Sequence, residues 1–304
     1  MTTEQTEAAT LNQSAIDNRV RQKIANVRNL PTPPIVFHQI QKVINDPNVS
    51  AGQISSILAE DPAMSVKVLK LTNSAFYGLA REIDSVKQAV VIVGIEAVRN
   101  LVLSASVLEM FKQKNADQDF QETFWRHSLA VAVCGRLLAK KIRSRGIVDP
   151  DGAFSAGLLH DVGKIILSCF LPDEYAKFTA EREQDADSPT YVIEDRALGY
   201  NHCQVGAILG TQWKLPSRLI QAVSYHHHPQ LADQDDPTAY LIHIANYLAK
   251  KAFADRGDSH LDMQLGDGVA EYMQVSDEEL GSYSDVLREE YLKAETFMKM
   301  AGVA

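Results

Sequence analysis

Residues 154–167 read FSAGLLHDVGKIIL and set a histidine and an aspartate, His160 and Asp161, side by side in apolar sequence. The flanking residues are apolar enough to bury the segment. Burying an ionised carboxylate is costly unless it is paired with a cation or bound to a metal. Two interpretations of Asp161 therefore stay open at this point: an ion pair with Lys164, three residues further along a helix, or a metal site.

Further histidines stand on both sides of this pair. His127 precedes it, and His202, His226 and His227 follow it. We expect each of these positions to begin or interrupt a helical segment, so that several imidazoles converge in the core of a bundle. Neutral imidazole with carboxylate is a ligand set for zinc, iron or manganese. A lone histidine here would be structural, but an array beside an embedded His–Asp pair favours a metal site.

Apolar residues recur at helical spacing along almost the whole chain. Ser50 and Ser85 are each expected to cap a helix, and the second of these helices is expected to run on through Ile95 to Ala105. There is no convincing alternation of apolar and polar residues and no internal repeat, and residues 89–95 are the one ambiguous short run. The sequence therefore predicts an all-α protein.

The composition excludes several classes of protein. The 304-residue chain is 45% hydrophobic and 23% charged, which is ordinary for a soluble globular protein, and its net charge of −9 argues against binding nucleic acid through phosphate neutralisation. The N-terminus lacks the pattern of a signal peptide, and the longest apolar stretch, 89–95, is far too short to span a membrane. Three separated cysteines, Cys134, Cys169 and Cys203, do not look like a disulfide framework. We expect a cytoplasmic protein with no nucleic-acid or membrane partner.

The order of the motifs resembles the HD superfamily of metal-dependent phosphohydrolases, and within it the HDOD domain, an HD-related output domain of bacterial signalling proteins. The HDxGK pattern stands at 160–164, between the other histidines. The N-terminal half is similar to that family as well, through LPTPP at 30–34, DPAMS at 61–65, LKLTNSAFYG at 69–78 and VGIEAVRNL at 93–101. The resemblance is specific, because both halves match.

The resemblance implies an HD-superfamily helical bundle with an N-terminal helical layer. It covers residues 28–255, with the N-terminal layer at 28–115 and the HD-like core at 116–255. Outside it, we expect a segment with a short helix at 1–27 and a C-terminal helical appendage at 256–304.

Within the appendage, Ser276 and Glu279 have the spacing of a capping box in front of a helix. The helix carries an apolar stripe made of Leu287, Tyr291, Ala294, Phe297 and Met298. We expect this C-terminal helix to pack on its own domain rather than to bind a partner.

The resemblance also implies a set of site residues. In catalytic HD proteins the first histidine, the His–Asp pair and a later aspartate bind one metal, and further histidines complete a second site. Carried onto this sequence, the first-metal ligands are His127, His160 and Asp161. The second-metal ligands are His202, His226 and His227. Lys164 matches the lysine that contacts substrate phosphate in the HD-GYP branch, which cleaves cyclic dinucleotides. The metal would be a divalent ion such as iron, manganese or zinc.

One ligand position departs from the catalytic pattern. The later aspartate falls in a segment like IHIANYLA, residues 242–249, where the matching residue is Asn246. An amide offers a neutral oxygen and no charge, so the site would hold a dication more weakly and would activate a bound water differently. The GYP triplet is also missing after HHHP at 226–229.

These departures agree with the role of HDOD proteins as non-catalytic signalling outputs. The first hypothesis is a bacterial regulatory module with a degenerate metal site, which responds to a signalling protein partner or a small ligand. The alternative is a metal-dependent phosphohydrolase acting on a nucleotide or cyclic dinucleotide, which the retained histidines, Asp161 and Lys164 support. Under the first hypothesis, we expect the groove between the two layers, near Asn73, Arg99 and Asn100, to couple the incoming signal to the binding of the partner.

Overall fold

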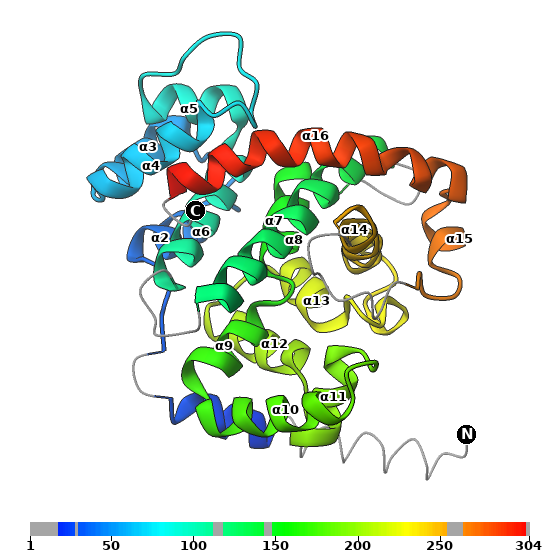
Figure 1. The fold of residues 1–304 in the computed structure, drawn as a ribbon. Helices are drawn as coiled ribbons and strands as arrows, with labels where there is room; N and C mark the ends of the chain where they lie inside the picture. Colours follow the sequence, from blue (N-terminus) through cyan, green and yellow to red (C-terminus); the bar gives the residue numbers. More distant parts are fainter. Residues whose placement is uncertain (1–17, 28–29, 112–117, 143–147, 254–263, 302–304) are drawn as a thin grey trace.

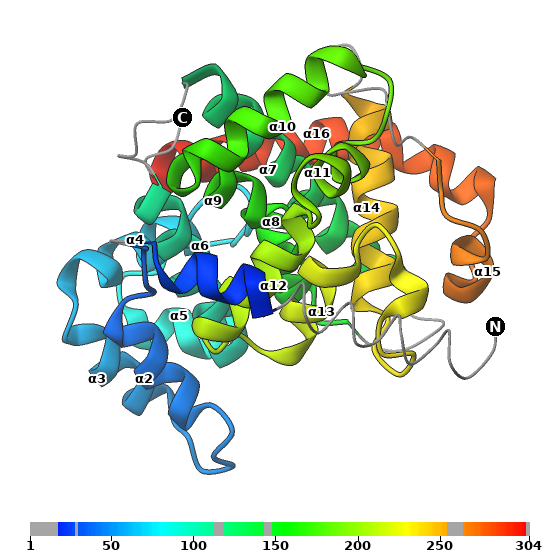
Figure 2. The same ribbon diagram turned by 90° about the horizontal axis from the view of Figure 1, so that it is seen from below.

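Every regular element in the described part of the chain is a helix, which confirms the all-α prediction (Figure 1). The computed structural model describes residues 18–27, 30–111, 118–142, 148–253 and 264–301. The first described residues, 18–25, are helical, and Lys23 pairs with Glu174 of the core. The chain then forms an N-terminal layer, a larger helical core that holds the His–Asp pair, and finally a long helix that lies across both (Figures 1 and 2).

Five helices make up the N-terminal layer. They are α2 (Ile35–Val43), α3 (Ala51–Ala59), α4 (Pro62–Thr72), α5 (Val86–Val93) and α6 (Ile95–Phe111). Local sequence sets their starts. The Ser50 side chain accepts a hydrogen bond from the Gln53 amide and the Gln53 side chain accepts one from the Ser50 amide, so the predicted cap is a full capping box. At α4 the cap is a single hydrogen bond, which the Asp61 side chain accepts from the Met64 amide, and Pro62 occupies the first turn.

The helix predicted to run from Ser85 to Ala105 is instead two helices. Ser85 does cap α5, but α5 ends at Gly94 and α6 leaves it at an angle of 118°. Gly94 has a φ of +95°, a backbone region that residues with a Cβ rarely adopt. The single-helix prediction was therefore wrong at this glycine, and the ambiguous run 89–95 is helical up to Val93.

The core is built around α7 (Gln118–Lys141), which packs mainly against α8 (Pro150–Leu159) and α14 (Thr238–Ala252). Helix α12 (His202–Gln212) packs on α9 (Val162–Phe170) and α13 (Ser217–Tyr225), and α13 packs in turn on α8 and α14. Two further helices lie at the edge: α10 (Pro172–Gln184) packs on α9, and α11 (Thr190–Leu198) packs on α10 and α12 (Figure 1).

Two glycines let α7 and α8 approach closely. A Cβ at Gly157 in α8 would lie 2.6 Å from the Ala132 Cα in α7, and a Cβ at Gly135 in α7 would lie 3.2 Å from the Ala153 carbonyl oxygen in α8. Both contacts are with backbone, which cannot rotate away. The close approach buries every residue of α8 from Gly152 onward. Helix α8 is thus the rigid centre of the core, and the His–Asp pair follows directly after it.

The last two helices are α15 (Val269–Met273) and α16 (Asp277–Ala301). The predicted capping box between Ser276 and Glu279 is present at the start of α16. Helix α16 crosses α7 and α14 and reaches α4 in the N-terminal layer (Figure 1). Leu287, Tyr291 and Ala294 are buried, so this helix packs on its own protein as expected. The side chains of Phe297 and Met298 lie outside the described residues.

By length and composition, the segment Pro150–Phe170 could cross a membrane. However, 78% of its apolar window is buried inside the protein, and the segment is the core pair α8 and α9. Its apolar character is explained by packing against the surrounding helices.

Replacing Gly157 with alanine is expected to destabilise the fold, because the new methyl would collide with the α7 backbone. Overpacking of this kind costs about 1–3 kcal/mol. Gly281→Ala is a matched control: it adds the same methyl to α16 where nothing lies within 4 Å, and it is expected to stabilise by about 0.5–1 kcal/mol. Urea unfolding followed by circular dichroism measures both changes. Equal stability of the two variants would contradict the packing argument.

Candidate metal centre

The structure brings the predicted ligands together from four helical segments. His160 ends α8 and Asp161 begins α9, so a two-residue break between these helices holds the pair. His202 is the first residue of α12, and His226 follows the last residue of α13. These positions do interrupt or begin helices. His127 does not: it lies inside α7, where the expectation of a helix start was wrong, and it reaches the centre because α7 runs alongside α8.

The glycine of the HDxGK pattern explains how α12 reaches Asp161. A Cβ at Gly163 would lie 1.9 Å from the carbonyl oxygen of His202. No other residue could occupy this position without separating α9 from α12. The missing side chain therefore allows the two helix starts to touch and places the His202 ring against the carboxylate of Asp161.

Asp161 is the common partner of the whole group. Its side chain is 2% exposed. On one oxygen, Oδ2 lies 2.7 Å from Lys164 Nζ, 3.2 Å from His160 Nε2 and 3.7 Å from His127 Nε2.

The other oxygen, Oδ1, lies 3.1 Å from His202 Nε2 and 3.4 Å from His226 Nε2. His227 joins through His202, with their Nε2 atoms 3.3 Å apart. All six predicted ligands, together with Lys164, thus form one cluster.

Three of the rings are oriented as metal ligands are. Their Nδ1 atoms face oxygens: the Gly157 carbonyl for His160 at 2.7 Å, Glu194 Oε2 for His202 at 2.6 Å and the Val223 carbonyl for His226 at 3.1 Å. An Nδ1 that faces an oxygen carries the proton, so the neutral ring turns the lone pair of Nε2 toward Asp161. A lone pair facing a carboxylate needs a cation between them, either a proton or a metal.

The charges in the cluster follow from burial and mutual contact. Burial would raise the pKa of Asp161, but His160 and Lys164 outweigh it and hold that pKa well below its usual range. Burial lowers the pKa of His160 to about 3, so this ring is neutral and its Nε2 is free to bind a metal. Burial also opposes charge on His226, yet contact with Cys203 and Asp161 raises its pKa to about 9.

Of the two interpretations of Asp161 from the sequence, the ion pair is present in the structure, and the metal site stays a prediction. The ion pair with Lys164 occupies Oδ2. Oδ1 is buried and receives no hydrogen bond from the described residues. Lys164 thus neutralises Oδ2, whereas Oδ1 faces the Nε2 atoms of His202 and His226, where either a proton on a ring or a metal ion would neutralise it.

Asn246, the position that departs from the catalytic pattern, is buried in the core. It lies in α14, which packs against the helix that carries His127, and it is 5% exposed. Its Oδ1 is a buried acceptor that meets no donor in the described part of the chain. A buried acceptor without a donor fits a position where a metal or its bound water would otherwise lie.

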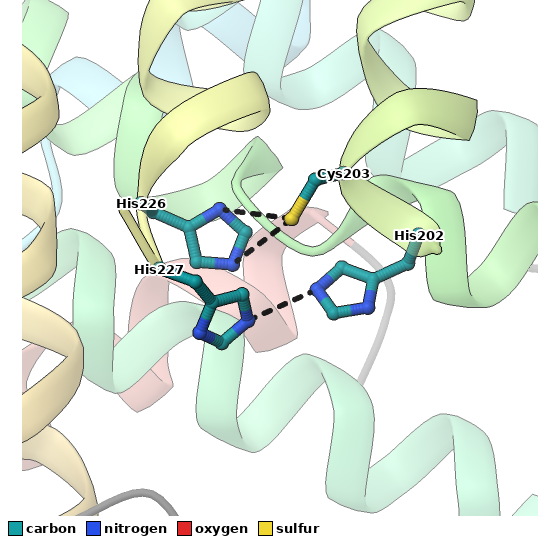
Figure 3. A group of neighbouring side chains, drawn as sticks. All are labelled: His202, Cys203, His226 and His227. Carbon is teal, nitrogen blue, oxygen red and sulfur yellow. Dashed lines mark hydrogen bonds between the residues drawn. The ribbon is translucent and has the colours of Figure 1, made fainter. Parts of the chain in front are cut away.

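Two residues of the centre were not among the predicted site residues. Glu194 in α11 accepts hydrogen bonds from both the backbone amide and the ring of His202, at 2.8 and 2.6 Å. Cys203 lies beside the histidine-rich end, with its Sγ 3.9 and 4.0 Å from the two ring nitrogens of His226 (Figure 3). The adjacency of His202 and Cys203 at a helix start was the available signal for Cys203. Nothing in the sequence marks Glu194.

A bundle of helices around a buried His–Asp cluster defines an HD-type protein. The family model of the HDOD domain matches residues 30–229, which is more than half of the chain, and the chain belongs to this family. The resemblance noted in the sequence is confirmed.

Three similar proteins were compared with the chain. A candidate phosphohydrolase from Shewanella amazonensis is 25% identical, with a TM-score of 0.69 over 93% of this chain and 98% of that one. A candidate signal transduction protein from Marinobacter aquaeolei is 20% identical, with a TM-score of 0.76 over 96% of this chain and 66% of that one. An uncharacterised Treponema pallidum protein is 24% identical over 72% of this chain, which spans only 42% of that relative.

Loading the centre with a divalent metal is expected to release protons near neutral pH. The metal takes the Nε2 lone pairs, and the raised pKa of His226 means that a proton occupies this position below about pH 9. Apparent affinity should therefore rise with pH up to that value, by about tenfold per pH unit for each proton displaced. Calorimetric titration with zinc in buffers of different ionisation enthalpy counts the protons. Zinc affinity that does not change between about pH 6 and 8, where imidazole ordinarily titrates, would contradict the assignment of these histidines as metal ligands.

Proposed function

We propose that this chain is a regulatory output module of bacterial signal transduction, acting in the cytoplasm, with a metal centre that no longer catalyses hydrolysis. The observation that carries the proposal is the closure of the centre around Asp161. His160, His202 and His226 have no exposed surface, and Lys164 donates to Asp161 instead of facing a substrate. A phosphate group would have to displace this ion pair to reach a metal-bound water.

Asn246 supports the loss of catalysis. Catalytic members of the superfamily resemble this chain but have an aspartate at the matching position. Because Asn246 is an amide and not a carboxylate, the predicted first-metal site has one negative charge fewer. Lys164 already neutralises Oδ2 of Asp161 in that site. A second dication on that side would meet an ammonium group and too little negative charge to hold it.

Helix α8 offers a route from the centre to the N-terminal layer. Its C-terminal end carries His160 and its first turn carries Asp151. The Asp151 carboxylate accepts a hydrogen bond from Tyr77 Oη at 3.2 Å and lies 3.3 Å from Arg136 Nε. Arg136 also donates to the Phe76 carbonyl at 3.0 Å. A change at the centre that shifts α8 would therefore change the contacts that hold the two layers together.

Arg99 and Asn100 form a second tie at the same end of α8. Arg99 donates to the side-chain oxygen Oδ1 of Asn100 at 3.1 Å, and the Asn100 side chain donates to Asp149, the residue that caps α8, at 3.2 Å. The Asn73 side chain instead makes its hydrogen bonds to the backbone of Ile83, within the N-terminal layer. We infer that a signalling protein partner senses this interface.

The alternative function is a metal-dependent phosphohydrolase acting on a nucleotide or cyclic dinucleotide. The retained cluster favours it, since a vestigial site need not keep four histidines around one buried carboxylate. The candidate phosphohydrolase from Shewanella amazonensis has the same fold. Here the metal ion would supply an activated water, while Lys164 would leave Asp161 to hold the substrate phosphate.

A direct assay separates the two functions. Nucleotides and cyclic dinucleotides are incubated with the protein and manganese, iron or zinc, and product is measured by chromatography. We expect no turnover above that of Asp161→Ala. Turnover that disappears in Asp161→Ala would establish the alternative instead.

Asn246→Asp is expected to tighten metal binding, because it restores the charge missing on the first-metal side. Competition with a fluorescent chelator measures the affinity for manganese, and Asn246→Ala serves as the control that removes the amide without adding charge. An aspartate variant no tighter than the alanine variant would show that Asn246 does not face the metal.

Arg99→Ala is expected to weaken the tie between the layers by about 1–2 kcal/mol without changing metal content, because it removes the donor that holds Asn100. Arg126→Ala is the control, since its partner Glu122 lies one turn away on the surface of the same helix. Unfolding curves and elemental analysis give both readouts. Unchanged stability, with a partner captured only through residues 276–304, would contradict the proposed interface.

A further inference from the structure

We infer that Cys203 is a metal ligand, and that with His202, His226 and His227 it forms a site for a thiophilic divalent ion such as zinc. The inference rests on the proposed metal centre and goes beyond it, because it adds a sulfur ligand to the histidine-rich end. It also assigns that end to a class of metal different from the one that oxygen-rich ligands select.

The four donors lie close enough together to reach one metal ion. One donor atom of each residue lies within 4.8 Å of every other. In a tetrahedral zinc site, bond lengths of about 2.0 Å to nitrogen and 2.3 Å to sulfur put two nitrogens about 3.3 Å apart and a nitrogen and a sulfur about 3.5 Å apart. The two Nε2 atoms of His202 and His227 are 3.3 Å apart, and Cys203 Sγ is 4.0 Å from His226 Nε2.

Hydrogen bonds to neighbouring residues fix these donors before any metal binds. Asn201 caps α12 and accepts a hydrogen bond from the Cys203 amide at 3.0 Å, which holds the first turn of the helix. Glu194 sets the His202 ring and the Val223 carbonyl sets the His226 ring. Figure 3 shows the thiol and the three imidazoles directed toward one another from the start of α12 and the end of α13.

A second observation points to a cation at the same place. Asp161 Oδ1, buried and without a hydrogen bond from the described residues, lies 3.1 Å from His202 Nε2 and 3.4 Å from His226 Nε2. A metal held by these rings would therefore lie beside a carboxylate oxygen, which would complete its charge balance. Cys134 provides a contrast, since it is buried within the hydrophobic core and belongs to no such cluster.

The sulfur ligand predicts which metal ions the site prefers. Thiolate favours zinc, iron and cobalt over manganese and magnesium, which prefer oxygen. The other group, His127, His160 and Asp161, has only nitrogen and oxygen donors, which are harder ligands than sulfur. The first equivalent of zinc should therefore bind at the histidine-rich end, next to the oxygen of Asp161 that Lys164 does not occupy.

Cobalt(II) provides the test, because a cysteine thiolate bound to cobalt gives a charge-transfer absorption band in the near ultraviolet. The full-length protein is titrated with cobalt and then with zinc, in the wild type, Cys203→Ser and Cys134→Ser. We expect the band in the wild type and in Cys134→Ser, its loss in Cys203→Ser, and zinc affinity at least tenfold weaker in Cys203→Ser. Circular dichroism checks that each variant is folded, and Cys203→Ala repeats the measurement with a different side chain.

The outcomes separate this inference from the proposed function. Cobalt that binds without the band, with equal affinity in the wild type and Cys203→Ser but not in His202→Ala, would overturn the sulfur ligand and leave the metal centre in place. Failure of cobalt, zinc and manganese to bind the folded wild type would overturn the metal centre itself, and the role of Cys203 with it.

Discussion

The buried carboxylate of Asp161 is the constraint on which the rest of the core depends. An ionised group at this depth has to be surrounded by donors or cations, and α7, α9, α12 and α13 each supply at least one. The helices can bring these groups to one point only if their backbones approach closely. Glycines at 157 and 163 make that approach possible, so the charge and the packing are two parts of one arrangement.

Much of this arrangement could be predicted from the sequence. The His–Asp pair in apolar surroundings predicted a buried charged site, and helical spacing predicted the fold class. The helix caps at Ser50 and Ser85 were predicted because capping depends on a few adjacent residues. The turn at Gly94 was missed, since the apolar pattern continues across it and only the backbone dihedral angle reveals the break.

The ligand set was predicted from the resemblance, but its geometry was not. No local pattern shows that His127 reaches the centre from the middle of a helix, or that Glu194 orients His202 from a neighbouring helix. Packing between α9 and its neighbours likewise decides which oxygen of Asp161 pairs with Lys164. These are long-range contacts, and they determine whether the cluster acts as a catalyst or as a sensor.

The ammonium group of Lys164 has one more consequence. Because it neutralises Asp161 from within the same helix turn, the protein supplies its own counterion at the centre and does not require an imported cation to bury this carboxylate. The apoprotein can therefore fold and persist. In the proposed metal centre, an ion would therefore bind to an already folded molecule, and its binding and release would report a cellular condition instead of deciding between folding and degradation.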